Sequence, residues 1–236
     1  MESAFSFSAA AEKAGIAIVS AAGFGVVPTD IAARLAAEAL PDADKLVLAY
    51  STKGGASRGT LKTVLKDIHK PGVVLRDGTF APAQPAMSTH TFSVGDQSFE
   101  GVYNPWRADL LTAQHSTSIR NIETYTTFPG IIVHMMKGRL GWLRKFMLNR
   151  LINWLPEGPS EKQMQKGATF INATAYKGSQ QAEVHIKGPE AYIFTIECIF
   201  QLLLALDKEP GLKGAIPPSK FGQTLISSIP GVSIFS

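Results

Sequence analysis

Residues 15–51 change character in an order that predicts an α/β fold. The apolar run from Gly15 to Ala21 is typical of a strand, and the segment from Asp30 to Leu40 is helix-like. Leu46 to Ser51 is a second apolar run of strand length. A strand, a helical connection and another strand predict two parallel strands of one sheet.

The remaining sequence predicts a different arrangement, because its apolar residues alternate. Asp77-Gly78 stands at the turn of a predicted hairpin, residues 73–83. Further antiparallel strands are predicted over residues 89–104, 121–128, 168–178 and 181–188. Helices are predicted over residues 57–68, 131–154 and 191–206. A short parallel unit is thus followed by mainly antiparallel strands and helices.

The composition is that of a globular chain without a strong charge. Of 236 residues, 45% are apolar and 18% are charged, and the net charge is +4. Because most Lys and Arg are scattered, we expect no nucleic acid as a partner. The apolar run 191–206 is short for a membrane span, the N-terminus lacks a secretory pattern, and the single cysteine fits a reducing compartment. We therefore expect a cytoplasmic protein, with membrane association as a further option.

The first glycine-rich turn begins like a dinucleotide-binding fingerprint. Gly23 and Gly25 occupy the first two glycine positions of G-x-G-x-x-G, but Pro28 stands at the third. The fingerprint also needs an acidic residue at the end of the next strand, where this chain has Thr52 and Lys53. The pattern therefore argues against a pyrophosphate site, although the glycines let a flat ring or a backbone approach closely.

Residues 55–59 spell G-x-S-x-G, the nucleophile-elbow pattern of serine hydrolases. Aspartates and histidines follow in the required order, for example Asp109 and His185. However, Ser57 does not follow its strand directly, and only one strand precedes it. The favoured interpretation is that Ser57 caps a helix, at whose N-terminus Arg58 and the glycines bind an anion.

Residues 131–154 predict one long helix rich in cations. An apolar stripe at helical spacing runs along it, formed by Leu140, Leu143, Met147, Leu151 and Trp154. Five Lys or Arg share the segment with no acidic residue. Such a helix either lies on an anionic membrane surface or at an acyl-chain site, or covers a core with its cations at the edges.

No metal site is expected in this chain. The five histidines have no metal-ligand spacing among themselves or with Cys198. Cys198 lies in the most apolar segment, and we interpret it as an inert core residue.

Four segments, taken together, carry a family resemblance. They are AAGFGVVPTDIAA (21–33), GGASRGTLKT (54–63), SIRNIETYTTFP (118–129) and IPPSKFGQTLISSIPGV (216–232). In this order, over nearly the whole chain, they resemble the saccharopine dehydrogenase-like oxidoreductases. The most similar branch includes saccharopine reductase-like proteins and trans-acting enoyl reductases of lipid metabolism. The resemblance implies hydride transfer, dependent on NAD or NADP, to or from a C=N, C=O or C=C bond.

The resemblance also implies a fold and a set of site residues. The fold is α/β (α+β), with a remnant of a Rossmann-like parallel sheet in residues 1–52 and a mixed, mainly antiparallel sheet with packed helices in residues 53–236. The second part would bind substrate and dimerise, and the tail from about 207 to 236 would pack back on the remnant. Cofactor-side residues would be Gly23, Phe24 and Pro28. Substrate-side residues would be Thr29, Asp30, Ser57, Arg58 and Thr60. No catalytic acid or base is implied.

The family's complete dinucleotide fingerprint is not among these residues, so we expect the chain alone to bind NAD or NADP weakly or not at all. Its activity would then need a Rossmann half supplied by a separate chain, and a homodimer is a further expected partnership. One alternative function is a non-catalytic lipid- or membrane-associated binding module that uses residues 131–154. A less favoured alternative is a serine hydrolase that uses Ser57.

Overall fold

Strand β2 (Lys45–Lys53) lies in the middle of the larger sheet and has a partner along both edges. The structure is a computed structural model that describes residues 5–236, apart from the side chain of Asn149. Strand β2 runs parallel to β7 (Asn121–Thr126) and antiparallel to β8 (Ala168–Lys177). Its side chains alternate between two separate core clusters, so the strand is covered on both faces.

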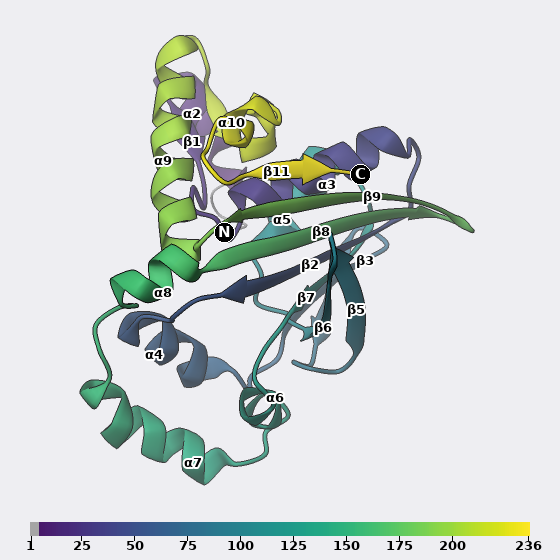
Figure 1. Cartoon of the computed structure of the whole chain (residues 1–236). Helices are drawn as coiled ribbons and strands as arrows, with labels where there is room; N and C mark the ends of the chain where they lie inside the picture. Colours follow the sequence, from purple (N-terminus) through teal and green to yellow (C-terminus); the bar gives the residue numbers. More distant parts are fainter. Residues whose placement is uncertain (1–4) are drawn as a thin grey trace.

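Among the described residues, the larger sheet has nine strands. Their order is β11-β9-β8-β2-β7-β3-β4, with β6 beside β7 and β5 beside β6 (Figure 1). The other bounds are β3 Gly72–Arg76, β4 Thr79–Ala83, β5 Thr89–Val94, β6 Gln97–Tyr103, β9 Gln180–Pro189 and β11 Ser233–Phe235. Every pair of neighbouring strands in this sheet is antiparallel, except the pair formed by β2 and β7, which is parallel. The predicted fold class, a small parallel sheet and a larger mixed sheet with packed helices, is confirmed.

The hairpin turns form where the sequence places turn residues. Asp77 and Gly78 both have positive φ angles, 49° and 80°, as a two-residue turn between β3 and β4 requires. Gly95 and Gly178, both with φ of 58°, stand in the turns of the β5–β6 and β8–β9 hairpins. One strand differs from expectation: β7 is antiparallel to β3 and β6 but parallel to β2.

The predicted parallel pairing of residues 15–21 with residues 46–51 is wrong. Strand β1 (Ala17–Val19) pairs in parallel with β10 (Gly214–Ile216) in a separate two-stranded sheet. Because β7 and β8 occupy both edges of β2, no edge of β2 is left for β1. Strand β10 belongs to the C-terminal tail, so the tail contacts the N-terminal segment. The domain division at residue 52, which falls inside β2, stays a prediction.

Helices α3 and α5 cover one face of the larger sheet (Figure 1). Helix α3 (Val27–Ala39) presents three fully buried alanines, Ala32, Ala33 and Ala36, which allow close packing against β8 and β9. Helix α5 packs against α3. The remaining bounds are α2 Ser8–Ala14, α4 Arg58–Asp67, α5 Asp109–Thr117, α8 Glu161–Lys166, α9 Ala191–Lys208, η3 Pro218–Phe221 and α10 Thr224–Ser227.

The predicted continuous helix over residues 131–154 is wrong. The segment forms α6 (Gly130–Met136), α7 (Gly141–Phe146), the π-helical turn η1 (Met147–Leu151) and the 3-10 turn η2 (Ile152–Trp154). Gly138 and Leu140, with φ angles of 73° and 56°, interrupt the path between α6 and α7. A left-handed residue ends a right-handed helix, so the apolar stripe expected from one helix is divided.

Helix α9 is buried on one side only, although its sequence predicts a buried helix. Phe194, Cys198 and Leu202 lie one turn apart and enter the main core. Burial raises the pKa of the Cys198 thiol to about 12, as expected for an inert core residue. The opposite side exposes Ile193, Ile196, Ile199, Phe200, Leu203 and Leu204. In the part of the chain that the structure describes, no helix combines the length and the hydropathy needed to cross a membrane.

Candidate functional site

Two groups of predicted site residues lie near the carboxyl end of β2, the edge at which parallel strands commonly bind ligands. The first turns of α9 contact both groups. Tyr192 contacts the start of α4, and Thr195 contacts the glycine turn before α3. Thr127, which follows β7, donates its hydroxyl to Ser51 Oγ at 2.7 Å. The ends of the two parallel strands are therefore joined beside the site.

Three hydroxyl groups form the first group, which we call the hydroxyl cluster: Ser57, Thr60 and Tyr192. Ser57 caps α4, because its Oγ accepts from the Thr60 backbone N–H at 3.1 Å. The Ser57 backbone N–H donates to Tyr192 Oη at 2.8 Å, and Thr60 Oγ1 lies 2.9 Å from the same oxygen. The predicted helix cap is confirmed, and the cap also positions a phenol from a distant helix.

The hydroxyl cluster changes the acidity of Tyr192. Burial acts to raise the pKa of the Tyr192 phenol, but hydrogen bonds with Ser57 and Thr60 outweigh burial, and the pKa is lowered from its ordinary value. Donors aimed at the phenol oxygen favour the phenolate, because they stabilise its negative charge. The phenol is therefore better suited than an isolated tyrosine to release a proton.

Glu190 fixes the start of α9 from a buried position. Its Oε2 accepts from the backbone N–H groups of Tyr192 at 2.7 Å and Ile193 at 3.3 Å. Its Oε1 is buried without a hydrogen-bond partner among the described residues. Gly167 leaves room for this side chain, since a Cβ there would collide with the glutamate, and a Cβ at Gly54 would lie 3.2 Å from Glu190 Cγ, a tight contact. The carboxylate thus determines where the helix, and with it Tyr192, begins.

The second group surrounds the glycine turn. The Phe24 backbone N–H donates to Thr195 Oγ1 at 3.3 Å, and the rings of Phe24 and Tyr50 meet edge to face with centroids 6.0 Å apart. Gly23 lies under Thr195, whose Cγ2 would be 3.2 Å from an added Cβ. The glycine therefore permits a close approach of α9, which is a packing role.

Arg107 holds this second group together. Its guanidinium lies 4.1 Å from the Tyr50 ring centroid, donates to the Gly25 carbonyl, and pairs with Asp109 at 2.6 Å. Burial alone would lower the pKa of Arg107, but the charge of Asp109 outweighs it and the pKa is raised. The side chains of Arg107 and Asp109 are 11% and 1% exposed, so this is a buried ion pair.

The glycine turn does not fit a pyrophosphate. An anion site at a helix N-terminus needs free backbone N–H groups, but the N–H of Phe24 is bonded to Thr195, and those of Val26 and Val27 are bonded to the Gly23 carbonyl. Pro28 has no N–H to offer. We therefore derive no reaction step through a dinucleotide bound at this turn.

Pro28, Thr29 and Asp30 are buried in α3 and do not face the hydroxyl cluster. Helix α3 begins at Val27, earlier than the predicted Asp30, so Thr29 lies within its first turn, and Thr29 Oγ1 donates to the Val26 carbonyl at 3.0 Å. Asp30 accepts from Ser116 Oγ at 2.7 Å and from the Ser219 backbone N–H at 2.8 Å. With no exposed surface, Asp30 joins α3 to α5 and η3 and is a structural residue.

Asp30 should make stability fall as pH rises above about 4. Burial, only partly offset by hydrogen bonds from Ser219 and Ser116, raises its pKa above the ordinary 3.8. Between the unfolded and the folded pKa the native state holds the extra proton, so raising the pH lowers the free energy of unfolding. Urea denaturation across pH 3.5–7 should show this decline in wild type and not in Asp30→Asn.

The control for this experiment is Asp30→Ala, which leaves the Ser116 and Ser219 donors unpaired and should cost about 1–3 kcal/mol at about pH 3.5. This cost should shrink as pH rises, because only the wild type has the carboxyl that loses its proton. Equal pH slopes in wild type and Asp30→Asn would contradict the assigned direction of the pKa.

Arg58 is at the start of α4, where its Nη2 pairs with Glu157 at 3.1 Å and its Nη1 reaches the Asn153 carbonyl at 3.4 Å. Glu157 is almost fully exposed, so the pair is a surface interaction. The hydrolase alternative gains no support from the geometry around Ser57, because Ser57 contacts Thr60 and Tyr192. His185, on β9, instead lies beside Glu183, Asn172 and Phe235.

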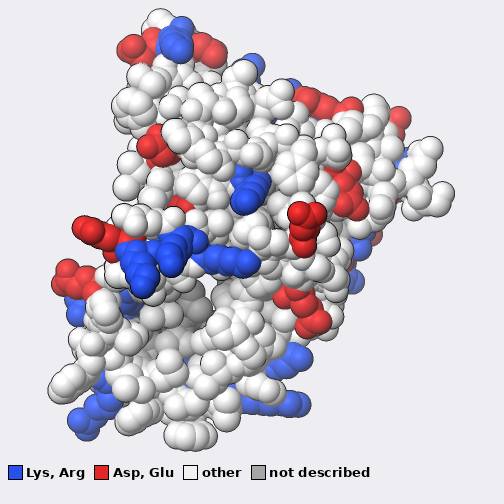
Figure 2. All heavy atoms as spheres, in the orientation of Figure 1, with Lys and Arg blue, Asp and Glu red and all other residues white. Residues whose placement is uncertain are grey.

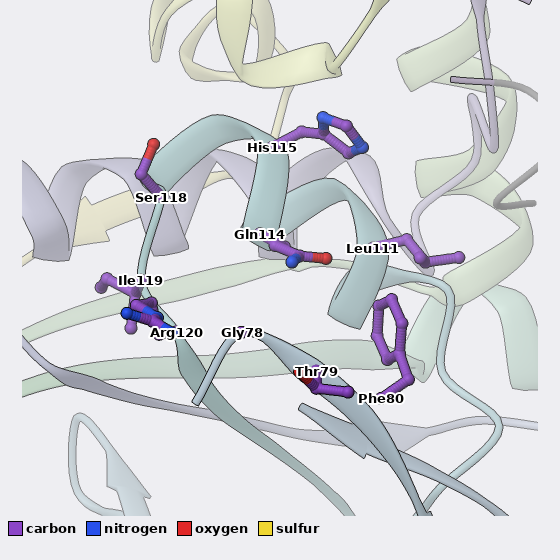
Figure 3. A pocket seen from close by; sticks show the side chains of 9 residues that line it. All are labelled: Gly78, Thr79, Phe80, Leu111, Gln114, His115, Ser118, Ile119 and Arg120. Atoms are coloured by element: carbon purple, nitrogen blue, oxygen red, sulfur yellow. The ribbon is translucent and has the colours of Figure 1, made fainter. Parts of the chain in front are cut away.

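A cavity of about 730 Å³ lies elsewhere, between the β3–β4 turn, the end of α5 and the start of β7 (Figure 3). Two of its polar side chains are engaged in protein contacts: Arg120 donates to the Asp77 carbonyl at 2.6 Å, and His115 stacks on Phe5. Figure 3 shows the His115 ring pointing away from Gly78. We therefore place the candidate site at the hydroxyl cluster. No group of three or more His, Cys, Asp or Glu among the described residues is placed to hold a metal ion.

Sequence reasoning missed Tyr192, Glu190 and Arg107. A carboxylate directly before a long apolar run is a helix-cap signal, so Glu190 was within reach. Tyr192 had no such signal, because it lies 135 positions from Ser57 in the chain. Arg107 was likewise one of many scattered cations.

Comparison with known proteins supports the fold. No protein-family model matches the chain, and no curated protein matches its sequence. Among solved structures, the apo histidine-tagged saccharopine dehydrogenase (L-Glu forming) from Saccharomyces cerevisiae is similar, with a TM-score of 0.50 and 8% sequence identity. The match covers 94% of this chain and 74% of that chain. The chain therefore has a saccharopine dehydrogenase-like fold, as the sequence resemblance implies.

Proposed function

We propose that this chain provides the substrate-binding part of an NAD(P)-dependent oxidoreductase, with the reacting group of the substrate at the hydroxyl cluster. The observation that carries the proposal is the Tyr192 phenol, partly exposed at the carboxyl end of β2, with a lowered pKa and two hydrogen-bonding neighbours. The saccharopine dehydrogenase-like fold supports the reaction class.

Tyr192 would act on the heteroatom of a C=N or C=O bond. A nicotinamide cofactor would supply the hydride in this class of reaction, held by a Rossmann half on a separate chain. When the carbon gains hydride, the nitrogen or oxygen needs a proton, and a phenol with a lowered pKa can donate it. The Ser57 N–H and the Thr60 hydroxyl would then stabilise the phenolate left behind.

Arg58 would orient the substrate. Its present partner, Glu157, is a surface carboxylate, and such pairs are worth no more than about 1 kcal/mol. A substrate carboxylate can therefore replace Glu157 at little cost and gain a charge-assisted contact beside the hydroxyl cluster. In the finer version of the proposal, which follows the enoyl reductase branch of the resemblance, the substrate is an acyl C=C compound of lipid metabolism. The β-carbon would then gain the hydride, and the α-carbon would gain the proton from Tyr192.

Tyr192→Phe should lower the rate of NADPH oxidation by about 10²–10⁴-fold, the usual range for one general acid. The assay is run in the presence of a chain that supplies the Rossmann half, with millimolar NADPH and with small 2-oxo acids, their imines and 2-enoyl acids as substrates. Loss of the phenol removes the proton donor and leaves the ring in place.

Tyr176→Phe is the matched control, because Tyr176 lies opposite Lys45 at the start of β2, whereas the hydroxyl cluster lies near the carboxyl end of β2. It should retain the wild-type rate. Equal rates in Tyr192→Phe and Tyr176→Phe would remove Tyr192 from the mechanism. Tight NADPH binding in a fluorescence titration would separately contradict our conclusion that the glycine turn does not fit a pyrophosphate.

A further inference from the structure

The segment from α6 to η2 exposes large apolar side chains beside unpaired cations. Residues 124–156 contain no Asp or Glu. We call the exposed set the basic aromatic surface, and its members are Trp142, Phe146, Leu151, Trp154, Lys137, Arg139, Lys145 and Arg150. None of its four cations has an ion-pair partner among residues 5–236.

Its two tryptophans are unusually exposed for a folded protein. Trp142 is 71% and Trp154 is 89% exposed. Tryptophan is a large, costly side chain to leave in water, and it is enriched where an apolar environment meets a polar one. Two such residues on one short segment indicate that the surface is covered when the protein acts.

The segment is held from its inner side, so the outward direction of this surface is fixed. Met135, Met136 and Ile152 are buried in a core cluster shared with α4. Arg144, the fifth cation, is turned inward and donates to the Leu65 and Lys66 carbonyls at 3.1 and 3.0 Å. Figure 1 places α6 and α7 at the end of the molecule farthest from α10 and β11.

Charge separates this surface from the other exposed apolar face, on α9. In Figure 2, blue side chains border the white surface at the end where α7 lies, and no acidic side chain is visible there on this face. The exposed side of α9 is apolar without interspersed cations. A surface of tryptophan and unpaired cations fits a partner that is apolar inside and negatively charged outside.

We propose that the basic aromatic surface binds an anionic lipid bilayer, with Trp142 and Trp154 inserted at headgroup depth and the four cations beside lipid phosphates or carboxylates. Since no described helix is fit to span a membrane, the contact is peripheral. This inference is independent of the proposed oxidoreductase activity, because it uses none of the residues of the hydroxyl cluster.

Vesicle co-sedimentation tests the inference, with vesicles of phosphatidylcholine alone and with 30% phosphatidylserine. We expect binding to the anionic vesicles, at least tenfold weaker binding to neutral ones, and loss of binding at high salt. Brominated lipids in the anionic vesicles should quench the fluorescence of Trp142 and Trp154. In Trp142→Phe/Trp154→Phe the remaining Trp106 should not be quenched.

Two variants probe the surface and one matched variant controls for exposed apolar residues. Lys145→Gln/Arg150→Gln should weaken binding at least tenfold, since each cation near an anionic surface contributes roughly a fivefold change. Trp142→Ser/Trp154→Ser should also weaken binding at least tenfold, because it removes both inserted apolar rings. Ile196→Ser/Leu203→Ser, at the 67% and 61% exposed positions of α9, should bind as wild type does. All substituted side chains are exposed, and circular dichroism checks that each variant is folded.

Several results would overturn the inference. The inference is wrong if folded wild type does not bind anionic vesicles, or if the surface variants bind as tightly as the α9 control. Equal binding to neutral and anionic vesicles would remove the role of the cations. Self-association or nucleic-acid binding that depends on Trp142 and Trp154, without vesicle binding, would assign the surface to another partner.

Discussion

Arg107→Met is expected to lower the free energy of unfolding by about 3–5 kcal/mol. The substitution leaves Asp109, which is 1% exposed, as a buried charge without its partner. It also removes the contact with the Tyr50 ring and the hydrogen bond to the Gly25 carbonyl. Urea denaturation at neutral pH measures the loss.

Two comparisons make the Arg107 prediction specific. Arg34→Met breaks an exposed pair with Glu38 and should cost no more than about 0.5 kcal/mol. Arg107→Met/Asp109→Leu removes both charges and should recover much of the lost stability, because the main cost is the unpaired carboxylate and not the missing attraction. A double variant as unstable as Arg107→Met would show that the cost comes from lost packing around Tyr50.

Gly167→Ala should destabilise the protein by about 2–3 kcal/mol, although its backbone angles suit alanine. The new Cβ would lie 2.7 Å from the Lys53 carbonyl oxygen and would also collide with Glu190. The carbonyl cannot move without disturbing the β2–β8 pairing, and Glu190 cannot move without leaving the start of α9. We therefore expect both a lower melting temperature and a pKa of Tyr192 closer to that of a free tyrosine.

Gly158→Ala is the control, since a Cβ there has no atom within 4 Å. It should leave the melting temperature within a degree or two of wild type. Ultraviolet titration of phenolate formation follows Tyr192 in each variant, with Tyr192→Phe as the blank. Wild-type stability in Gly167→Ala would show that β2 and β8 can separate at this end without cost.

The residues of the candidate site divide according to the range of the interactions that place them. Ser57 was predicted as a helix cap, and its cap bond to Thr60, three residues away, is local. Phe24 was predicted near a cofactor, and the prediction stays open, while Asp30 was predicted to face substrate and is buried. Tyr192, on which the proposed chemistry depends, was not predicted, because a tyrosine in an apolar segment carries no sign of its distant neighbours.

The sequence by itself determined the turns, the strand alternation and the helix capped by Ser57, because these depend on residues within one turn or one pleat of each other. Asp77-Gly78 is sufficient for a tight turn wherever the hairpin lies. Only the tertiary structure decided that β1 pairs with β10, that β2 lies between β7 and β8, and that Tyr192 meets Ser57. These contacts join segments far apart in the chain, so each depends on which edges and surfaces remain free once the other elements have packed.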